Sequence, residues 1–299
     1  MQYDEFGLFG ENAQEFGIEW HGTPQVERVS VDVGGGQVVS ALRWGSDPEL
    51  VLLHGGAQNA HTWDTVALAL DRSLLAIDLP GHGHSSHRDD HVYWPEQNAV
   101  AVAAALRSLD VSPRLVVGMS LGGLTSLALT SDASDLTPQL LLVDVTPGVN
   151  HEKASAIVRF IDGPEYFQSF DEILQRTILF NPTRSEQSLR RGVLHNAVEQ
   201  PDGRWSWRYD LPRRPAADAD PSESVIPGLD QLWQSVSEFS GPITLARGSL
   251  SPVVGDDDVE ELLRRRPDAR VEVFADAGHS IQGDKPVELA ALIADLLAQ

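Results

Sequence analysis

The sequence of 299 residues predicts an α/β protein with a mostly parallel central sheet, flanked by helices and interrupted by an inserted, mainly helical cap. Three observations favour this fold class. Short, wholly apolar runs alternate with segments of helical spacing, which is typical of a parallel sheet covered on both faces. A serine between two glycines stands at the end of one such run. The alternation stops at about residue 147 and resumes at about residue 241.

The first 25 residues are rich in glycine and polar side chains, and we expect them to form an extended N-terminal arm. Residues 26–33 and 37–44 alternate in polarity around three glycines, which predicts a β-hairpin. Apolar runs then predict buried strands at 50–53, 74–77, 115–117, 139–143, 243–246 and 271–274. Helices are predicted at 62–70, 95–109, 124–129, 258–266 and 286–297.

The block from 147 to 240 has no run that fits a buried strand. It contains amphipathic helical segments at 154–161, 170–179 and 185–198, the aromatic stretch 205–209, and a loop rich in Pro, Ala and Asp at 212–227. We interpret this block as a cap inserted into a single core domain, which would consist of residues 26–146 and 241–299.

Composition excludes several classes of function. With 22 basic and 44 acidic residues the formal net charge is -22, which disfavours binding to nucleic acid or to anionic membranes. The absence of cysteine excludes disulfides and cysteine-ligated metal. Neither a signal peptide nor a membrane-spanning apolar run is visible. We therefore expect a cytoplasmic protein that binds neither nucleic acid nor a membrane. The sequence leaves open whether it is a monomer or a homodimer.

Gly118-x-Ser120-x-Gly122 follows the strand run Leu-Val-Val and precedes a segment of helical composition. This is the pattern of a nucleophile elbow, in which a strained turn between strand and helix exposes a serine hydroxyl. The same turn directs the backbone amide of Leu121 toward the position where an oxyanion would form. Ser120 is therefore the candidate nucleophile.

The order of elements and motifs resembles the α/β-hydrolase fold superfamily over nearly the whole chain outside the arm and the cap. The motifs that carry this resemblance are His54-Gly55-Gly56, Asp78-Leu79-Pro80-Gly81-His82-Gly83-His84-Ser85, Gly118-Met119-Ser120-Leu121-Gly122-Gly123 and Gly278-His279. The resemblance implies that His279 is the base for Ser120 and that the Gly56 amide, or that of Ala57, joins Leu121 in an oxyanion hole. It implies no cofactor.

The acid of the expected triad is ambiguous in the sequence. Its most common position in the superfamily corresponds here to Ser251, which cannot supply a carboxylate. Asp144 follows the preceding strand, where some superfamily members, such as haloalkane dehalogenases, carry the acid. The run Asp256–Asp258 also lies nearby but fits a helix N-terminus, with capping-box spacing between Asp257 and Glu260. We predict Asp144, with that run and the absence of any acid as alternatives.

A cluster of histidines and three tryptophans are further candidates for a functional site. His82, His84, His87 and His91 lie on one loop, but the first two belong to the structural turn motif, so no metal site is predicted. Trp63 is predicted to line a substrate pocket. Trp205 and Trp207 alternate and so share one face of an extended segment, which predicts that they either line that pocket or pack the cap against the core.

These observations together predict a serine hydrolase for a small, largely apolar carboxylic ester or lactone, acting through an acyl-enzyme. Alternatives within the fold are hydrolysis of a carbon–carbon bond in vinylogous diketones, as in meta-cleavage-product hydrolases, and cofactor-free perhydrolysis. The serine at position 251 also keeps open a ligand-binding or signalling protein on a hydrolase framework.

Overall fold

A computed structural model describes residues 3–149, 151–210 and 228–299. Its main sheet has the strand order β1-β2-β4-β3-β5-β6-β10-β11. The two pairings that involve β2 are antiparallel, and the remaining pairings are parallel. The strands are β1 (Val26–Gly34), β2 (Gln37–Trp44), β3 (Leu50–Leu53), β4 (Leu74–Asp78), β5 (Leu115–Met119), β6 (Leu140–Val143), β10 (Ile243–Gly248) and β11 (Arg270–Phe274). The predicted hairpin and mostly parallel sheet are confirmed.

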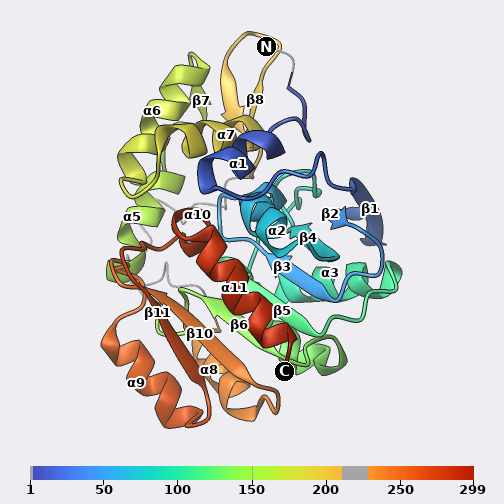
Figure 1. Ribbon diagram of the computed structural model, residues 1–299, viewed down its shortest axis with the longest axis vertical. Helices are drawn as coiled ribbons and strands as arrows, with labels where there is room; N and C mark the ends of the chain where they lie inside the picture. The colour runs from blue at the N-terminus through green and yellow to red at the C-terminus, as the bar shows by residue number, and fades with distance from the viewer. Residues whose placement is uncertain (1–2, 150, 211–227) are drawn as a thin grey trace.

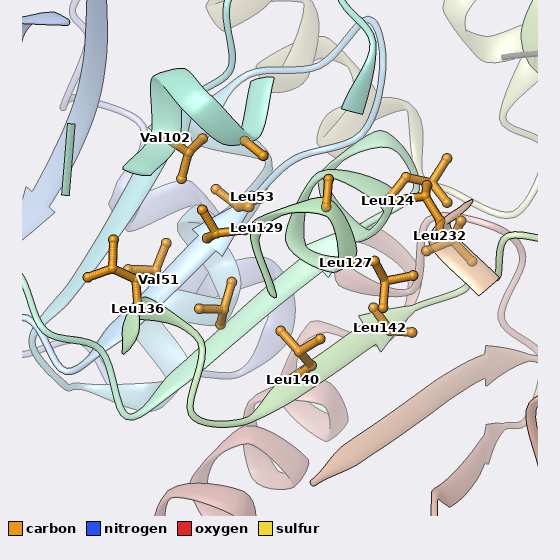
Figure 2. Packing of buried hydrophobic residues seen from close by; sticks show 14 of the residues in the cluster. Val51, Leu53, Val102, Leu124, Leu127, Leu129, Leu136, Leu140, Leu142 and Leu232 are labelled. Carbon is orange, nitrogen blue, oxygen red and sulfur yellow. The ribbon is translucent and has the colours of Figure 1, made fainter. Parts of the chain in front are cut away.

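The central strands are buried on both faces, which explains why they are apolar without alternation. Successive residues point to opposite faces and join two separate cores. Val51 and Leu53 of β3 belong to one core, whereas Leu50 and Leu52 belong to the other. Figure 2 shows the first core, where side chains of β3 and β6 meet those of the helices above them.

Helices cover both faces of the sheet (Figure 1). The first core is closed by α3 (Pro95–Ser108), α4 (Leu121–Asp132), the short η2 (Ser134–Leu136), α8 (Leu229–Glu238) and α9 (Asp256–Arg265). The second is closed by η1 (Ala60–Trp63), α2 (Asp64–Leu70), α10 (Ile281–Asp284) and α11 (Pro286–Leu297). This layering brings the carboxyl ends of the parallel strands, where the motifs lie, to one edge of the sheet.

The N-terminal arm is not simply extended, contrary to our expectation. It contains α1 (Phe9–Phe16), which ends at Gly17 in the left-handed conformation with φ of 64°. Phe9 is 1% exposed and packs against Trp44 with ring centroids 4.9 Å apart. The burial of this aromatic side chain outweighs the polar composition that suggested an extended arm.

The inserted block forms a small unit of its own beside the main sheet. It comprises α5 (His151–Ile161), β7 (Tyr166–Phe167), α6 (Phe170–Phe180), α7 (Glu186–Asn196), β8 (Ala197–Glu199) and β9 (Trp205–Trp207). The three short strands pair in the order β7-β9-β8 and, with α6 and α7, enclose a third core around Phe167 and Ile173. We refer to residues 151–207 as the cap unit.

Helix α8 falls within the predicted range of the cap, 147–240, but packs elsewhere. Leu232 and Val236 of α8 are buried in the first core, against α4. Apolar spacing alone shows that a helix is amphipathic and does not show which domain it covers. The loop predicted at 212–227 lies outside the described residues.

Candidate active site

Ser120 occupies a strained turn between β5 and α4. Its backbone has φ of 49° and ψ of -116°, a conformation that non-glycine residues rarely adopt. The flanking glycines allow the chain to pack this closely. A Cβ on Gly122 would lie 2.3 Å from the carbonyl oxygen of Leu53, and one on Gly118 would lie 2.4 Å from that of Gly122. The structure therefore has the geometry of a nucleophile elbow at Ser120.

His279 follows β11 and faces the cavity that Ser120 also lines. Its Nδ1 lies 2.7 Å from Oδ2 of Asp144, whose side chain is fully buried. Its Nε2 is buried and has no hydrogen-bond partner among the described residues. An imidazole oriented by a carboxylate on one nitrogen, with the other nitrogen available, is arranged to accept a proton from a hydroxyl.

Asp144 directly follows β6 and lies in the left-handed region, with φ of 51°. Its Oδ1 accepts the backbone N–H of Gly248 at 2.9 Å, and its Oδ2 accepts the hydroxyl of Ser251. Ser251 Oγ in turn accepts the N–H of Val253 at 3.1 Å. The serine at the usual position of the acid thus contacts the carboxylate on the neighbouring strand. A carboxylate is therefore present beside His279, which removes the reason to favour a binding protein without turnover.

The run Asp256–Asp258 has a different role. Asp258 accepts the N–H of Gly255 at 2.7 Å and so caps α9, while Lys153 lies 2.6 Å from the same carboxylate. Asp256 pairs with Arg247, and Asp257 is exposed. The N-terminus of α9 is capped by Asp258 rather than by the predicted pair of Asp257 and Glu260. None of the three contacts His279, so this alternative for the acid is wrong.

Two backbone amides remain available beside Ser120. Leu121 is the first residue of α4, so its N–H has no acceptor within the helix. The N–H of Gly56 has no backbone or side-chain acceptor among the described residues. The N–H of Ala57 already has an acceptor, because it donates to Nε2 of His82 at 3.1 Å. Gly56 and Leu121 are therefore the candidate oxyanion donors, and the substitute Ala57 is not available.

Two histidines of the sequence motifs that precede Ser120 in the chain, His54 and His82, have structural roles. His54 Nε2 accepts the N–H of Leu79 at 2.9 Å, and His82 Nδ1 lies 3.0 Å from the carbonyl of Pro80. Burial, with a smaller contribution from neighbouring His54, lowers the pKa of His82 to about 3. Burial also lowers the pKa of His54, so both rings are neutral at pH 7, and they fix the loops that carry Gly56 and Ala57.

The cavity has a volume of about 420 Å³ and lies between the core domain and the cap unit. Ser120, His279 and Gly56 line it on the core side. The cap side contributes the apolar residues Ala156, Ile157, Phe160, Phe180 and Trp207, and also polar residues such as Arg184, Arg191 and His195. The sequence did not single out Ile157 or Phe160, although their spacing of three residues places them on one face of α5.

The three predicted pocket tryptophans have different positions. Trp207 lines the cavity and packs against Phe160 with ring centroids 5.6 Å apart. Trp63 is fully buried in the second core and does not line the cavity, so this prediction is wrong. Trp205 is also absent from the cavity wall, because it packs edge-to-face on Phe170 in the cap unit. The alternation of Trp205 and Trp207 shows a shared face, but the two lie against different partners.

The model of the alpha/beta hydrolase family matches residues 50–292, which include every candidate catalytic residue. The chain belongs to the alpha/beta hydrolase family. It is 43% identical to Esterase Rv0045c of Mycobacterium tuberculosis over 98% of this chain and 96% of that protein. A solved structure of that esterase superposes with a TM-score of 0.86 over the full length of both chains.

More distant relatives of the family also match. The mouse sn-1-specific diacylglycerol lipase ABHD11 is 27% identical over 84% of this chain and 81% of its own. Within the described residues, every helix is too short or too polar to cross a membrane.

Proposed function

We propose that this protein is a serine ester hydrolase for small, largely apolar carboxylic esters or lactones. The observation that carries the proposal is the pairing of His279 with buried Asp144, while the free Nε2 of His279 and Ser120 share one cavity. The similarity to Esterase Rv0045c supports the same class of reaction.

In the proposed mechanism, Ser120 Oγ attacks the ester carbonyl carbon as its proton passes to Nε2 of His279. Asp144 stabilises the resulting imidazolium without taking the proton. The amides of Gly56 and Leu121 hold the oxyanion, each contributing about 3 kcal/mol of stabilisation to the transition state. The intermediate collapses, His279 protonates the leaving alcohol, and water then releases the acid from the acyl-enzyme by the same steps.

The cavity supports the choice of substrate. The apolar part of its wall on the cap side presents Ile157, Phe160 and Phe180, which suit an alkyl or aryl group of the ester. The name of the mouse relative, a diacylglycerol lipase, refers likewise to an ester with apolar acyl groups. The limited volume favours short or medium chains over a whole diacylglycerol.

The direct test is hydrolysis of p-nitrophenyl esters from acetate to decanoate by the wild type and by Ser120→Ala, with folding of both verified by circular dichroism. We expect turnover that depends on Ser120 and falls for the longest chains. The absence of serine-dependent hydrolysis across the series would contradict the proposal, and vinylogous diketones would be the next substrates to test.

A further inference from the structure

A second group of titratable side chains lies in the wall of the same cavity, outside the candidate active site. It consists of His61 on η1, Asp64 on α2 and His195 on α7 of the cap unit. The side chains of all three are at most 4% exposed. Asp64 Oδ2 lies 2.9 Å from Nδ1 of His61 and 3.7 Å from Nε2 of His195. We call these residues the junction cluster.

Two atoms of the junction cluster have no hydrogen-bond partner among the described residues. They are Oδ1 of Asp64 and Nε2 of His195. Leaving a buried carboxylate oxygen and a buried imidazole nitrogen unpaired costs free energy, which a ligand that binds both would recover. Because the cluster lines the cavity, such a ligand could enter from there.

The outer nitrogens of both histidines already have polar partners. His61 Nε2 lies 3.2 Å from a carboxylate oxygen of Glu5, and His195 Nδ1 lies 2.7 Å from the hydroxyl of Tyr3. Protein metal sites are commonly built this way, with one ring nitrogen facing the ion and the other held by a carboxylate or another polar group. Both partners come from the N-terminal arm.

We propose that the junction cluster is a binding site for a divalent transition-metal ion such as Zn²⁺, ligated by His61 Nδ1, the Asp64 carboxylate and His195 Nε2. Two imidazoles and one carboxylate are a donor set that such ions prefer. The three ligand atoms lie within 4.8 Å of one another, and tetrahedral ligands at zinc distances are separated by about 3.3 Å. Three protein ligands leave a fourth position for water.

Binding requires two local changes. The rings of His61 and His195 are stacked, with centroids 3.8 Å apart and planes at 12°, so one ring must turn for both nitrogens to face one ion. We assign the turn to His195, because its Nε2 has no partner to lose, and the hydrogen bond between its Nδ1 and the Tyr3 hydroxyl must then re-form on the turned ring. The ion also replaces the proton that His61 Nδ1 shares with Asp64, and that proton leaves to the buffer.

Charges of both signs surround the junction cluster. Glu5 and Asp64 are the nearest carboxylates, whereas Arg28, 3.4 Å from His61 Nε2, and Arg191 and Arg208, which act on His195, are the opposing charges. Burial lowers the pKa of His195, and the charge on His61 lowers it further. The His195 ring is therefore neutral at pH 7, which is the form that binds a metal.

The test is calorimetric titration of ZnCl₂ into the full-length protein after removal of metal with EDTA, in two buffers of different ionisation enthalpy. We expect one ion per chain with release of protons. His195→Ala and Asp64→Asn should each weaken the affinity at least about tenfold, and Tyr3→Phe, which keeps all three ligands, should weaken it less. The matched control is His91→Ala, an exposed histidine 2.6 Å from Asp210, which should bind as the wild type does.

Co²⁺ provides a second, spectroscopic measurement, which reports the coordination of the ion in the wild type directly. A four-coordinate Co²⁺ site absorbs strongly in the visible range, and the absorption should be absent from His195→Ala. If the wild type shows no saturable binding, or if His195→Ala and Tyr3→Phe both bind Zn²⁺ with wild-type affinity, the proposal is wrong. Loss of binding in His91→Ala alone would instead assign the ion to the protein surface.

Discussion

Ser251 donates a hydrogen bond to Oδ2 of Asp144, the same oxygen that lies 2.7 Å from Nδ1 of His279. The residue at the common position of the acid has therefore become a partner of an acid on the adjacent strand. A carboxylate that accepts hydrogen bonds from a hydroxyl, an amide and an imidazole is held in one orientation. This arrangement fixes both the tautomer and the direction of the imidazole.

Replacing Asp144 with asparagine should lower kcat by about 10³- to 10⁴-fold, because the amide cannot stabilise the imidazolium. KM should change little, since Asp144 is buried behind His279 and does not line the cavity. The matched control is Asp257→Asn, which alters an exposed carboxylate and should retain full activity. A larger loss in Asp257→Asn than in Asp144→Asn would reverse the assignment. Steady-state kinetics on a p-nitrophenyl ester measures kcat and KM for both variants.

Ser251→Ala should reduce kcat about tenfold, which corresponds to about 1.4 kcal/mol, at the lower end for one hydrogen bond to a charged group. The double variant Asp144→Asn with Ser251→Asp should recover part of the activity lost in Asp144→Asn, because it moves the carboxylate to the neighbouring strand end. Unchanged kcat in Ser251→Ala would show that the hydroxyl does not contribute to orientation.

Trp207→Ala should change selectivity among acyl chains, because Trp207 lines the cavity wall. We expect kcat/KM for the longer esters to rise relative to acetate as the cavity enlarges. Trp205→Ala removes a side chain of the same size from the same strand, but outside the cavity wall, and should leave the ratio unchanged. Equal shifts in both variants would mean that the cap unit responds as a whole.

Gly122→Ala should destabilise the fold by about 1–3 kcal/mol, because its Cβ would overlap the carbonyl oxygen of Leu53 at 2.3 Å. Gly192→Ala is the contrasting change. Gly192 lies within α7 with open space at its Cβ position, so alanine should stabilise by about 0.5–1 kcal/mol. Urea unfolding curves measure both changes, and a neutral Gly122→Ala would contradict the close packing at the elbow.

Burial lowers the pKa of His61, but Asp64 and Glu5 outweigh this effect and raise it to about 9. Because this pKa exceeds the ordinary value of 6.5, the stabilisation is fully present below pH 6.5 and is lost as the pH rises through 9. In EDTA, His61→Gln should therefore be less stable than the wild type at pH 6, by on the order of 1–3 kcal/mol, with a smaller difference at pH 9.5. A difference independent of pH would contradict the charged state of His61.

Motifs at strand ends, such as those around Ser120 and His279, could be located from sequence because their residue types and order reflect local backbone requirements. The buried strands were equally clear, since residues covered on both faces must all be apolar. The choice of Asp144 rested on an analogy, and the contact with Ser251 could not be foreseen because it joins residues 107 positions apart. Trp63 and Trp205 failed as pocket residues because an aromatic side chain suits a core and a cavity wall equally well.

The junction cluster could not be predicted from the sequence either. His61 and Asp64 are neighbours along the chain, but His195 comes from the cap unit, and Tyr3 and Glu5 come from the arm. Helix α1 was missed because its buried face depends on Phe9 meeting Trp44, a contact across the fold rather than a local pattern. In each case the structure depends on a contact between residues that are distant in the sequence, and local composition does not predict such contacts.

The central claim is that Ser120 is a nucleophile activated by His279. Labelling with a fluorescent, serine-reactive phosphonate, followed by mass spectrometry of the modified peptide, tests it most directly. We predict rapid modification at Ser120 in the wild type, none in Ser120→Ala, and strongly slowed modification in His279→Ala. Correctly folded wild type that is not labelled, or labelling at Ser120 that is equally fast in His279→Ala, would contradict this account of the site.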